Sequence, residues 1–117
     1  MDAADLTVSR PANGVAVVTL LGEWDMSNSG QLRERVRELL DEERSLVFDL
    51  DQAAFIDSTV INTLFQTQRE AREHGRELVL VVGTNARVRR VLEISGVVDA
   101  LACFVYLESA IAHLEAL

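Results

Sequence analysis

The sequence has no lysine, one proline and one cysteine among its 117 residues, and these shortages exclude several kinds of protein. Cys103 has no partner for an internal disulfide, which fits a reducing compartment. All 11 basic residues are arginines, and 19 acidic residues bring the net charge to -8. A chain this acidic repels phosphate backbones and anionic lipid, so we predict no direct nucleic-acid binding and no membrane insertion.

Long hydrophobic runs are also absent. The longest, at 15–21 and 78–82, are far shorter than the roughly 20 residues of a membrane span. The segment 1–5 lacks the basic start and apolar run of a signal peptide. Apolar residues make up 49% and charged residues 26%, a globular balance. We therefore expect one cytoplasmic domain over residues 1–117.

Hydrophobic periodicity predicts strands that alternate with helices. Strands are expected at 6–10 and 15–21, joined by a turn after Pro11, and then at 46–50, 78–82 and 104–106. Helices are expected from Ser27 or Ser29 to about Glu43, from 55–59 to His74, and over 85–95 and 109–117, with a loop at 22–26. This order indicates an α/β domain. Its mixed sheet has an antiparallel opening pair followed by parallel βα units and is packed with about four helices.

The residue types needed for catalysis or metal binding are sparse. His74, His113 and Cys103 are isolated from one another, so no metal site is predicted. The chain has no G-x-S-x-G, no P-loop and no G-x-G-x-x-G. A phosphoaccepting receiver domain could use a strand-end aspartate such as Asp49, but it also needs a lysine. We therefore expect no enzyme activity and no cofactor.

The tripeptide Asp57-Ser58-Thr59 stands between a predicted strand and a predicted helix. These residue types are favoured at helix N-caps, so capping is their simplest role. A hydroxyl at a helix start is also exposed, and the positive end of the helix tolerates an added phosphate. A kinase could therefore modify Ser58. Thr59 is the poorer acceptor because it is β-branched and is expected to point into the first helical turn.

At these residues the sequence resembles the STAS family, in particular the bacterial anti-anti-sigma factors. Three blocks in matching order carry the resemblance: a G-E-hydrophobic-D loop with the first helix, a strand and loop ending in a phosphorylatable D-S-[ST] turn, and a late strand with an R-x-L-E-x-[ST]-G helix end. They are Gly22-Glu23-Trp24-Asp25 with Leu32-Arg33, Val47-Phe48-Asp49-Leu50 through Phe55-Ile56-Asp57-Ser58-Thr59, and residues 75–80 with Arg90-Val91-Leu92-Glu93-Ile94-Ser95-Gly96.

The resemblance implies a regulatory protein rather than a catalyst. The unmodified protein would bind an anti-sigma factor that is also a Ser/Thr protein kinase, and so free a sigma factor. The kinase would end this binding by phosphorylating Ser58, and a phosphatase would reverse the modification. The implied partner-binding residues lie in the D-S-T turn, on the exposed side of the following helix and in the loop before the first helix: Asp57, Ser58, Thr59, Asn62, Thr63, Gln66, Asp25, Met26, Ser27 and Asn28.

Some readings stay open. Trp24 and Met26 are either apolar anchors of the interface or core residues. The chain departs from the family at Val60-Ile61-Asn62, where G-hydrophobic-G is frequent, and the change raises helix propensity because glycine costs about 1 kcal/mol relative to alanine. The alternative functions are an accessory subunit of a membrane lipid-transport ATPase, and a module that binds a small ligand or nucleotide.

Overall fold

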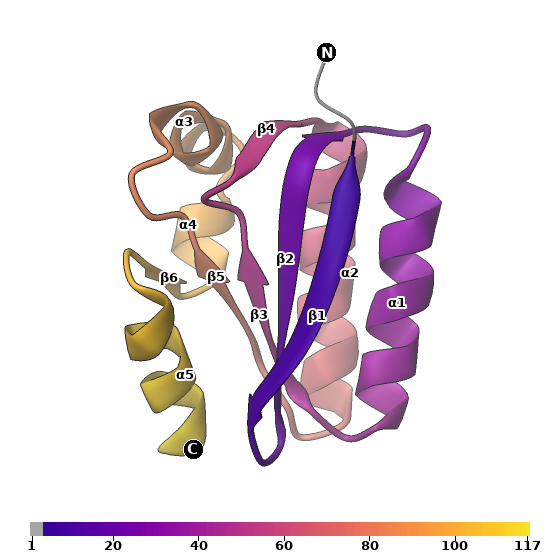
Figure 1. Ribbon diagram of the computed structural model, residues 1–117, viewed down its shortest axis with the longest axis vertical. Coiled ribbons are helices and arrows are strands. Elements are labelled where there is room, and N and C mark those ends of the chain that lie inside the picture. Colours follow the sequence, from indigo (N-terminus) through magenta and orange to yellow (C-terminus); the bar gives the residue numbers. More distant parts are fainter. Residues whose placement is uncertain (1–3) are drawn as a thin grey trace.

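The computed structural model of the protein describes residues 4–117 and is drawn in Figure 1. Residues 1–3, which enter the argument against a signal peptide, lie outside the described part. The elements in chain order are β1 (Asp5–Ala12), β2 (Val15–Trp24), α1 (Ser29–Asp41), β3 (Ser45–Asp49), β4 (Ala53–Ile56), α2 (Ser58–Glu73), β5 (Leu78–Val81), α3 (Ala86–Ile94), α4 (Val97–Ala100), β6 (Cys103–Phe104) and α5 (Leu107–Glu115). Across residues 4–117, no helix has both the length and the hydropathy to cross a membrane.

The six strands form one mixed sheet in the order β1-β2-β3-β5-β6, with β4 pairing only with the end of β2. β1 and β2 are antiparallel, and the β2–β3, β3–β5, β5–β6 and β2–β4 pairs are parallel. The predicted α/β class and mixed sheet are confirmed. The described residues form five helices rather than about four, because the short α4 follows α3 directly.

The core lies on both faces of the sheet, and β2 shows why. Ala16, Val18 and Leu20 pack into the larger cluster with side chains of α1, α2 and α3, whereas Val15 and Val17 pack with α5. Successive strand residues point to opposite faces, so an unbroken apolar strand is buried on both sides. In Figure 1, α1 and α2 lie on one side of the sheet and α5 lies on the other.

The predicted loop at 22–26 is wrong in its first half. Gly22, Glu23 and Trp24 are the last residues of β2, and they pair with β4, a strand that the sequence did not predict. The register shifts between Gly22 and Glu23, and Gly22 has a φ of 81°, a conformation that glycine adopts without strain. This bulge turns the end of β2 toward β4, and α2 then begins at Ser58.

The predicted ends of the first helix also need correction. The N-cap of α1 is Asn28, not Ser27 or Ser29, and no side chain caps the helix. The amide of Asn28 is used elsewhere, since its oxygen accepts from the Asp25 N–H at 2.9 Å. The helix ends at Asp41 because Glu43 has a positive φ of 60°.

At the carboxyl end the elements start earlier than predicted. The last strand is Cys103–Phe104 and α5 is Leu107–Glu115. Leu114 is buried as expected, but Leu117 lies beyond the helix and is 72% exposed. The prediction applies helical spacing as far as Leu117, but α5 ends at Glu115. Beyond the helix this spacing does not determine the direction of a side chain.

Asn85 holds together the loops at the upper edge of the sheet. Its side-chain N–H groups donate to the carbonyls of Leu50, Asp51 and Ala53 at 3.1, 3.0 and 2.8 Å. Its side-chain oxygen caps α3 by accepting from the Val88 N–H at 3.2 Å. One side chain thus fixes the position of α3 against the connection from β3 to β4.

We predict that Gly83→Ala destabilises the fold and that Gly30→Ala stabilises it. Gly83 has a φ of 59°, and a Cβ there would overlap the Asp51 carboxylate, which accepts from the Thr84 N–H. The expected loss is about 1–2 kcal/mol of unfolding free energy. Gly30 lies in α1 with no atom within 4 Å of its added Cβ, so a gain of up to about 1 kcal/mol is expected. Urea unfolding measures both, and equal midpoints for the two variants would contradict this account.

Candidate functional site

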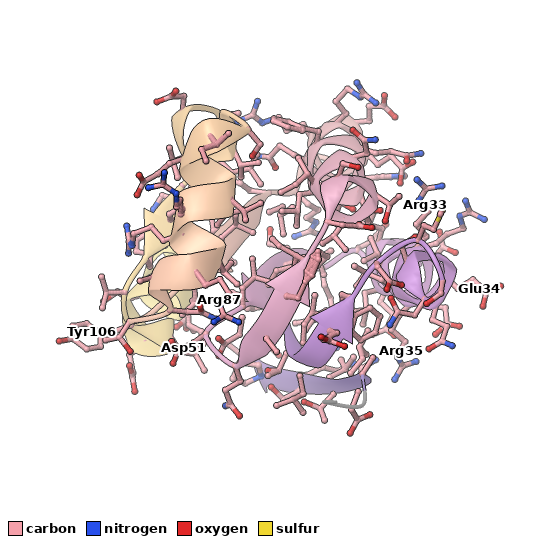
Figure 2. The ribbon with its side chains drawn as sticks, turned by 90° about the horizontal axis from the view of Figure 1, so that it is seen from above. Arg33, Glu34, Arg35, Asp51, Arg87 and Tyr106 are labelled. Atoms are coloured by element: carbon pink, nitrogen blue, oxygen red, sulfur yellow. The ribbon has the colours of Figure 1, made fainter. Side chains whose placement is uncertain are left out.

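The site lies at the edge of the sheet where β2 and β4 end. Trp24 pairs with Ile56, so the turn 25–28 and the start of α2 leave neighbouring strands at the same level. Figure 2 looks down onto this edge. Charged side chains of both signs surround it, with Arg33, Glu34 and Arg35 on α1 at one side and Arg87 and Asp51 at the other.

Asp57 caps α2 through a single carboxylate oxygen. Its Oδ1 accepts from the Thr59 N–H at 2.9 Å and from the Val60 N–H at 3.3 Å. The Thr59 hydroxyl donates to the same oxygen at 2.5 Å. Backbone donors at a helix start have no partner within the helix, so this side chain fixes where α2 begins.

Ser58 is the first residue of α2 and is exposed. Within the described residues its hydroxyl makes no hydrogen bond to protein, in contrast to that of Thr59. It stands at the positive end of a 16-residue helix. The arrangement presents one free hydroxyl at a fixed place, which is what a modifying enzyme needs.

Asp25 builds a similar turn on the neighbouring strand end. Its Oδ1 accepts from the N–H of Ser27 at 2.8 Å and from the Ser27 hydroxyl at 2.5 Å. These two bonds favour the charged carboxylate, so they hold the pKa of Asp25 below its ordinary value. Ser27, like Thr59, has its hydroxyl engaged by an aspartate two residues earlier.

Most of the predicted partner-binding residues lie at this edge. Asp57, Thr59, Gln66, Asp25 and Asn28 are half-buried, whereas Ser58, Asn62, Met26 and Ser27 are exposed. The prediction that Thr63 lies on the exposed side of the helix is wrong, because Thr63 is 1% exposed. It faces α1, from which the Arg33 Nε donates to its hydroxyl at 3.4 Å, and this hydroxyl donates to the Thr59 carbonyl within α2 at 3.0 Å.

Trp24 and Met26 were each expected to be either an interface anchor or a core residue, and the structure gives them different positions. Trp24 is a core residue, 1% exposed, and its indole N–H donates to the Leu21 carbonyl at 3.0 Å. Met26 is 79% exposed and remains available to a partner. The difference arises because Trp24 is the last residue of β2 and points into the core, whereas Met26 lies beyond the strand, in the turn 25–28.

An apolar groove beside Ser58 was not predicted. It has a volume of about 260 Å³ and lies between the first turns of α2 and the end of α3. A second hollow of about 240 Å³ adjoins it at Val91 and reaches Phe55 and Arg87. The residues that line the first are Asp57, Ser58, Ile61, Asn62, Val91, Ile94 and Ser95.

Two exposed apolar side chains of this region could have indicated the groove. Ile94 is 76% exposed and Phe55 is 41% exposed. Ile94 stands outside the inward stripe of α3 formed by Val88 and Leu92, so its position on an outer face could be read from helical spacing. That it would stand opposite Ser58 depends on how α3 packs, which local spacing does not encode.

Comparisons with known proteins agree with this architecture. A family model described as STAS domain matches residues 8–110. An anti-sigma factor antagonist from Mycobacterium paratuberculosis is 22% identical and superposes with a TM-score of 0.85 over 97% of this chain and 95% of that one. The Bacillus cell fate determinant SpoIIAA in its phosphorylated form is 18% identical, with a TM-score of 0.72 over 93% and 98%.

A third similar structure belongs to a different kind of protein. A sulfate transporter family protein from Wolinella succinogenes is 22% identical, with a TM-score of 0.72 over 92% of this chain and 90% of that one. Identities this low show a shared fold. Antagonists and a transporter family protein both have it, so the fold alone does not select between their functions.

We predict that Ser27→Ala raises the pKa of Asp25 toward its ordinary value. The Ser27 hydroxyl bond is the largest cause of the lowered pKa, and the backbone bond remains in the variant. A carboxylate whose pKa is lowered by folding stabilises the fold above its unfolded pKa and loses this effect as the pH falls through the folded value. Carboxyl-carbon NMR titration measures the shift, with Ser58→Ala as a control that leaves Asp25 unchanged. An Asp25 titration that is the same in both variants would refute the assignment.

Proposed function

The chain belongs to the STAS domain family, and from that premise we propose that it is an anti-sigma factor antagonist regulated by phosphorylation of Ser58. In its unmodified form it binds an anti-sigma factor that is also a Ser/Thr kinase, and a sigma factor is released. Phosphorylation ends the binding and a phosphatase restores it. The protein is a ligand and a substrate in this cycle, not a catalyst. The observation that carries the proposal is the exposed Ser58 hydroxyl on the rim of an apolar groove; this hydroxyl makes no hydrogen bond to any protein group of residues 4–117.

The groove supplies a docking surface next to the modified atom. Ile94 and Phe55 are exposed apolar side chains around it, and Met26 stands on the turn that follows the paired strand. Protein interfaces concentrate their binding energy in such apolar anchors at the centre of the contact. Ile61, which occupies the hydrophobic position of the family's G-hydrophobic-G motif, forms one wall and is 7% exposed.

A phosphate on Ser58 opposes docking for an electrostatic reason. It adds about -1.5 to -2 charges at pH 7, next to Asp57, on a chain of net charge -8. In the free protein, water and the N-terminus of α2 stabilise the phosphate. In a docked complex the water is removed, and burying the dianion without a cation costs several kcal/mol.

A second function is supported by the likeness to the sulfate transporter family protein. In that case the chain would attach to a membrane transporter, and Ser58 would be an interface residue that is never phosphorylated. Affinity purification from the native cell with phosphosite analysis separates the two. A co-purified transporter with unmodified Ser58 favours the attachment role, and a co-purified anti-sigma factor with phosphate on Ser58 favours the proposal.

We predict that Ser58→Asp weakens binding to the anti-sigma factor at least tenfold, which corresponds to about 1.4 kcal/mol. The added carboxylate places a charge at the groove rim, as the phosphate does. Ser58→Ala removes only an exposed hydroxyl and keeps the affinity within about threefold. Isothermal titration calorimetry against each anti-sigma kinase of the native cell measures both. Equal affinities for the two variants would contradict the proposed function.

We predict that Ile94→Ala also weakens this binding, by about five- to tenfold, because an exposed anchor is typically worth 1 kcal/mol or more. Ile94 is 76% exposed, so its truncation leaves the core intact. Leu117→Ala is the matched control, since Leu117 is 72% exposed and lies past α5, away from the groove. If both variants bind alike, the groove is not the docking surface.

A further inference from the structure

Two hydroxyl side chains follow each other at the start of α2, and the structure treats them differently. Ser58 lines the groove, is exposed and makes no hydrogen bond to protein within residues 4–117. Thr59 is half-buried and does not line the groove. Its hydroxyl donates to Asp57 Oδ1 at 2.5 Å, and its carbonyl accepts from Thr63 on the side of the helix that faces α1. Of the two hydroxyls, that of Ser58 is therefore available to receive a phosphate, and that of Thr59 is engaged in a hydrogen bond.

We propose that Asp57 is the positioning residue that directs phosphorylation to Ser58, because its carboxylate engages the hydroxyl of Thr59, which does not line the groove, and leaves that of Ser58 available. This inference rests on the proposed function, since it concerns which atom the kinase modifies. In the transfer, the bond between the γ-phosphorus of ATP and the oxygen of the leaving ADP breaks. A bond to a hydroxyl oxygen forms, and the hydroxyl proton passes to a carboxylate base of the kinase.

For Thr59 that transfer requires the bond to Asp57 to break first. A hydrogen bond to a charged acceptor is among the stronger ones in proteins. Asp57 Oδ1 also accepts from the N–H groups of Thr59 and Val60, so the carboxylate that engages the Thr59 hydroxyl is itself held by the backbone of the helix start. The hydroxyl of Ser58 carries no such restraint.

The same arrangement occurs at Asp25, whose Oδ1 engages both the N–H and the hydroxyl of Ser27. At this edge of the sheet, Asp25 and Asp57 each accept a hydrogen bond from the hydroxyl two residues later in the chain. In α2 the hydroxyl of Ser58, the residue directly after Asp57, is not engaged in this way. The selection is therefore made by hydrogen bonding within this chain before any kinase arrives.

The test uses Asp57→Ala and Asp57→Asn as a matched pair. Alanine removes the acceptor, whereas asparagine keeps an oxygen at the same position and differs mainly in charge. The 117-residue variants are incubated with Mg²⁺-ATP and the anti-sigma kinases of the native cell, and the phosphate is located by fragment mass spectrometry. We expect the ratio of Thr59 to Ser58 phosphate to rise about tenfold in Asp57→Ala and to stay at the unsubstituted level in Asp57→Asn.

Ser58→Ala supplies a second background for the same measurement. Alone it should take up no phosphate, and combined with Asp57→Ala it should take up phosphate on Thr59. Loss of the helix cap alone would lower phosphorylation of both residues without changing their ratio. NMR detection of a slowly exchanging Thr59 hydroxyl proton, present in the unsubstituted protein and in Asp57→Asn and absent in Asp57→Ala, tests the hydrogen bond without a kinase.

The outcomes separate this inference from the proposed function. An unchanged ratio in Asp57→Ala, or a rapidly exchanging Thr59 hydroxyl in the unsubstituted protein, overturns the role of Asp57 while the switch at Ser58 stands. Phosphate on Thr59 that disappears in Asp57→Ala would also overturn it and would make Asp57 a base. No phosphate on Ser58 of the unsubstituted chain overturns the proposed function, and with it this inference.

Discussion

The pairing of Trp24 with Ile56 is the constraint on which the functional edge depends. It joins the bent end of β2 to β4, so the turn 25–28 and the cap of α2 leave the sheet side by side. Trp24 is fully buried and its indole N–H is satisfied by the Leu21 carbonyl, so the pairing rests on a large area of apolar burial. The bulge at Gly22 makes this possible, because it turns the strand after its main pairing with β3 is complete.

The cap of α2 then fixes the position of the Ser58 hydroxyl, because it fixes the residue at which the helix begins. Asp57 sets the first residue of the helix, and Val60 and Leu64, both at 0% exposure, hold the helix against the sheet. Ser58 cannot shift along or around the helix without moving these core side chains. Since protein cores pack closely and deform little, the hydroxyl keeps its position relative to the groove. In the proposed switch, a phosphate on Ser58 would therefore act at this surface without any refolding of the domain.

What the sequence predicted well depends on local spacing, and what it missed depends on packing between distant segments. The inward stripe of α1, Leu32, Val36, Leu39 and Leu40, follows from 3.6 residues per turn and is buried as predicted. The order of strands and helices likewise followed from the alternation of periods. By contrast, β4 is only four residues long and pairs with a bent strand end. Its sequence has no alternating run from which a strand could be predicted. Thr63 was misplaced because a polar residue in a helix–helix contact has the same composition signal as an exposed one, and its partner Arg33 lies 30 residues away on α1.

A phosphate could oppose a partner either by long-range repulsion or by its desolvation within the contact, and the net charge of the chain indicates which effect dominates. The net charge is already -8, so phosphorylation changes it by only about a quarter or less. Long-range attraction or repulsion between the two proteins is also screened beyond about 8 Å at physiological salt. In the proposed switch, the effect of the modification therefore arises within the contact itself, where Ser58 and Asp57 line the same groove as Ile61 and Ile94. A dianion placed among side chains that would otherwise exclude water opposes docking through its own desolvation. This is why the position of one hydroxyl matters more to such a switch than the total charge of the protein.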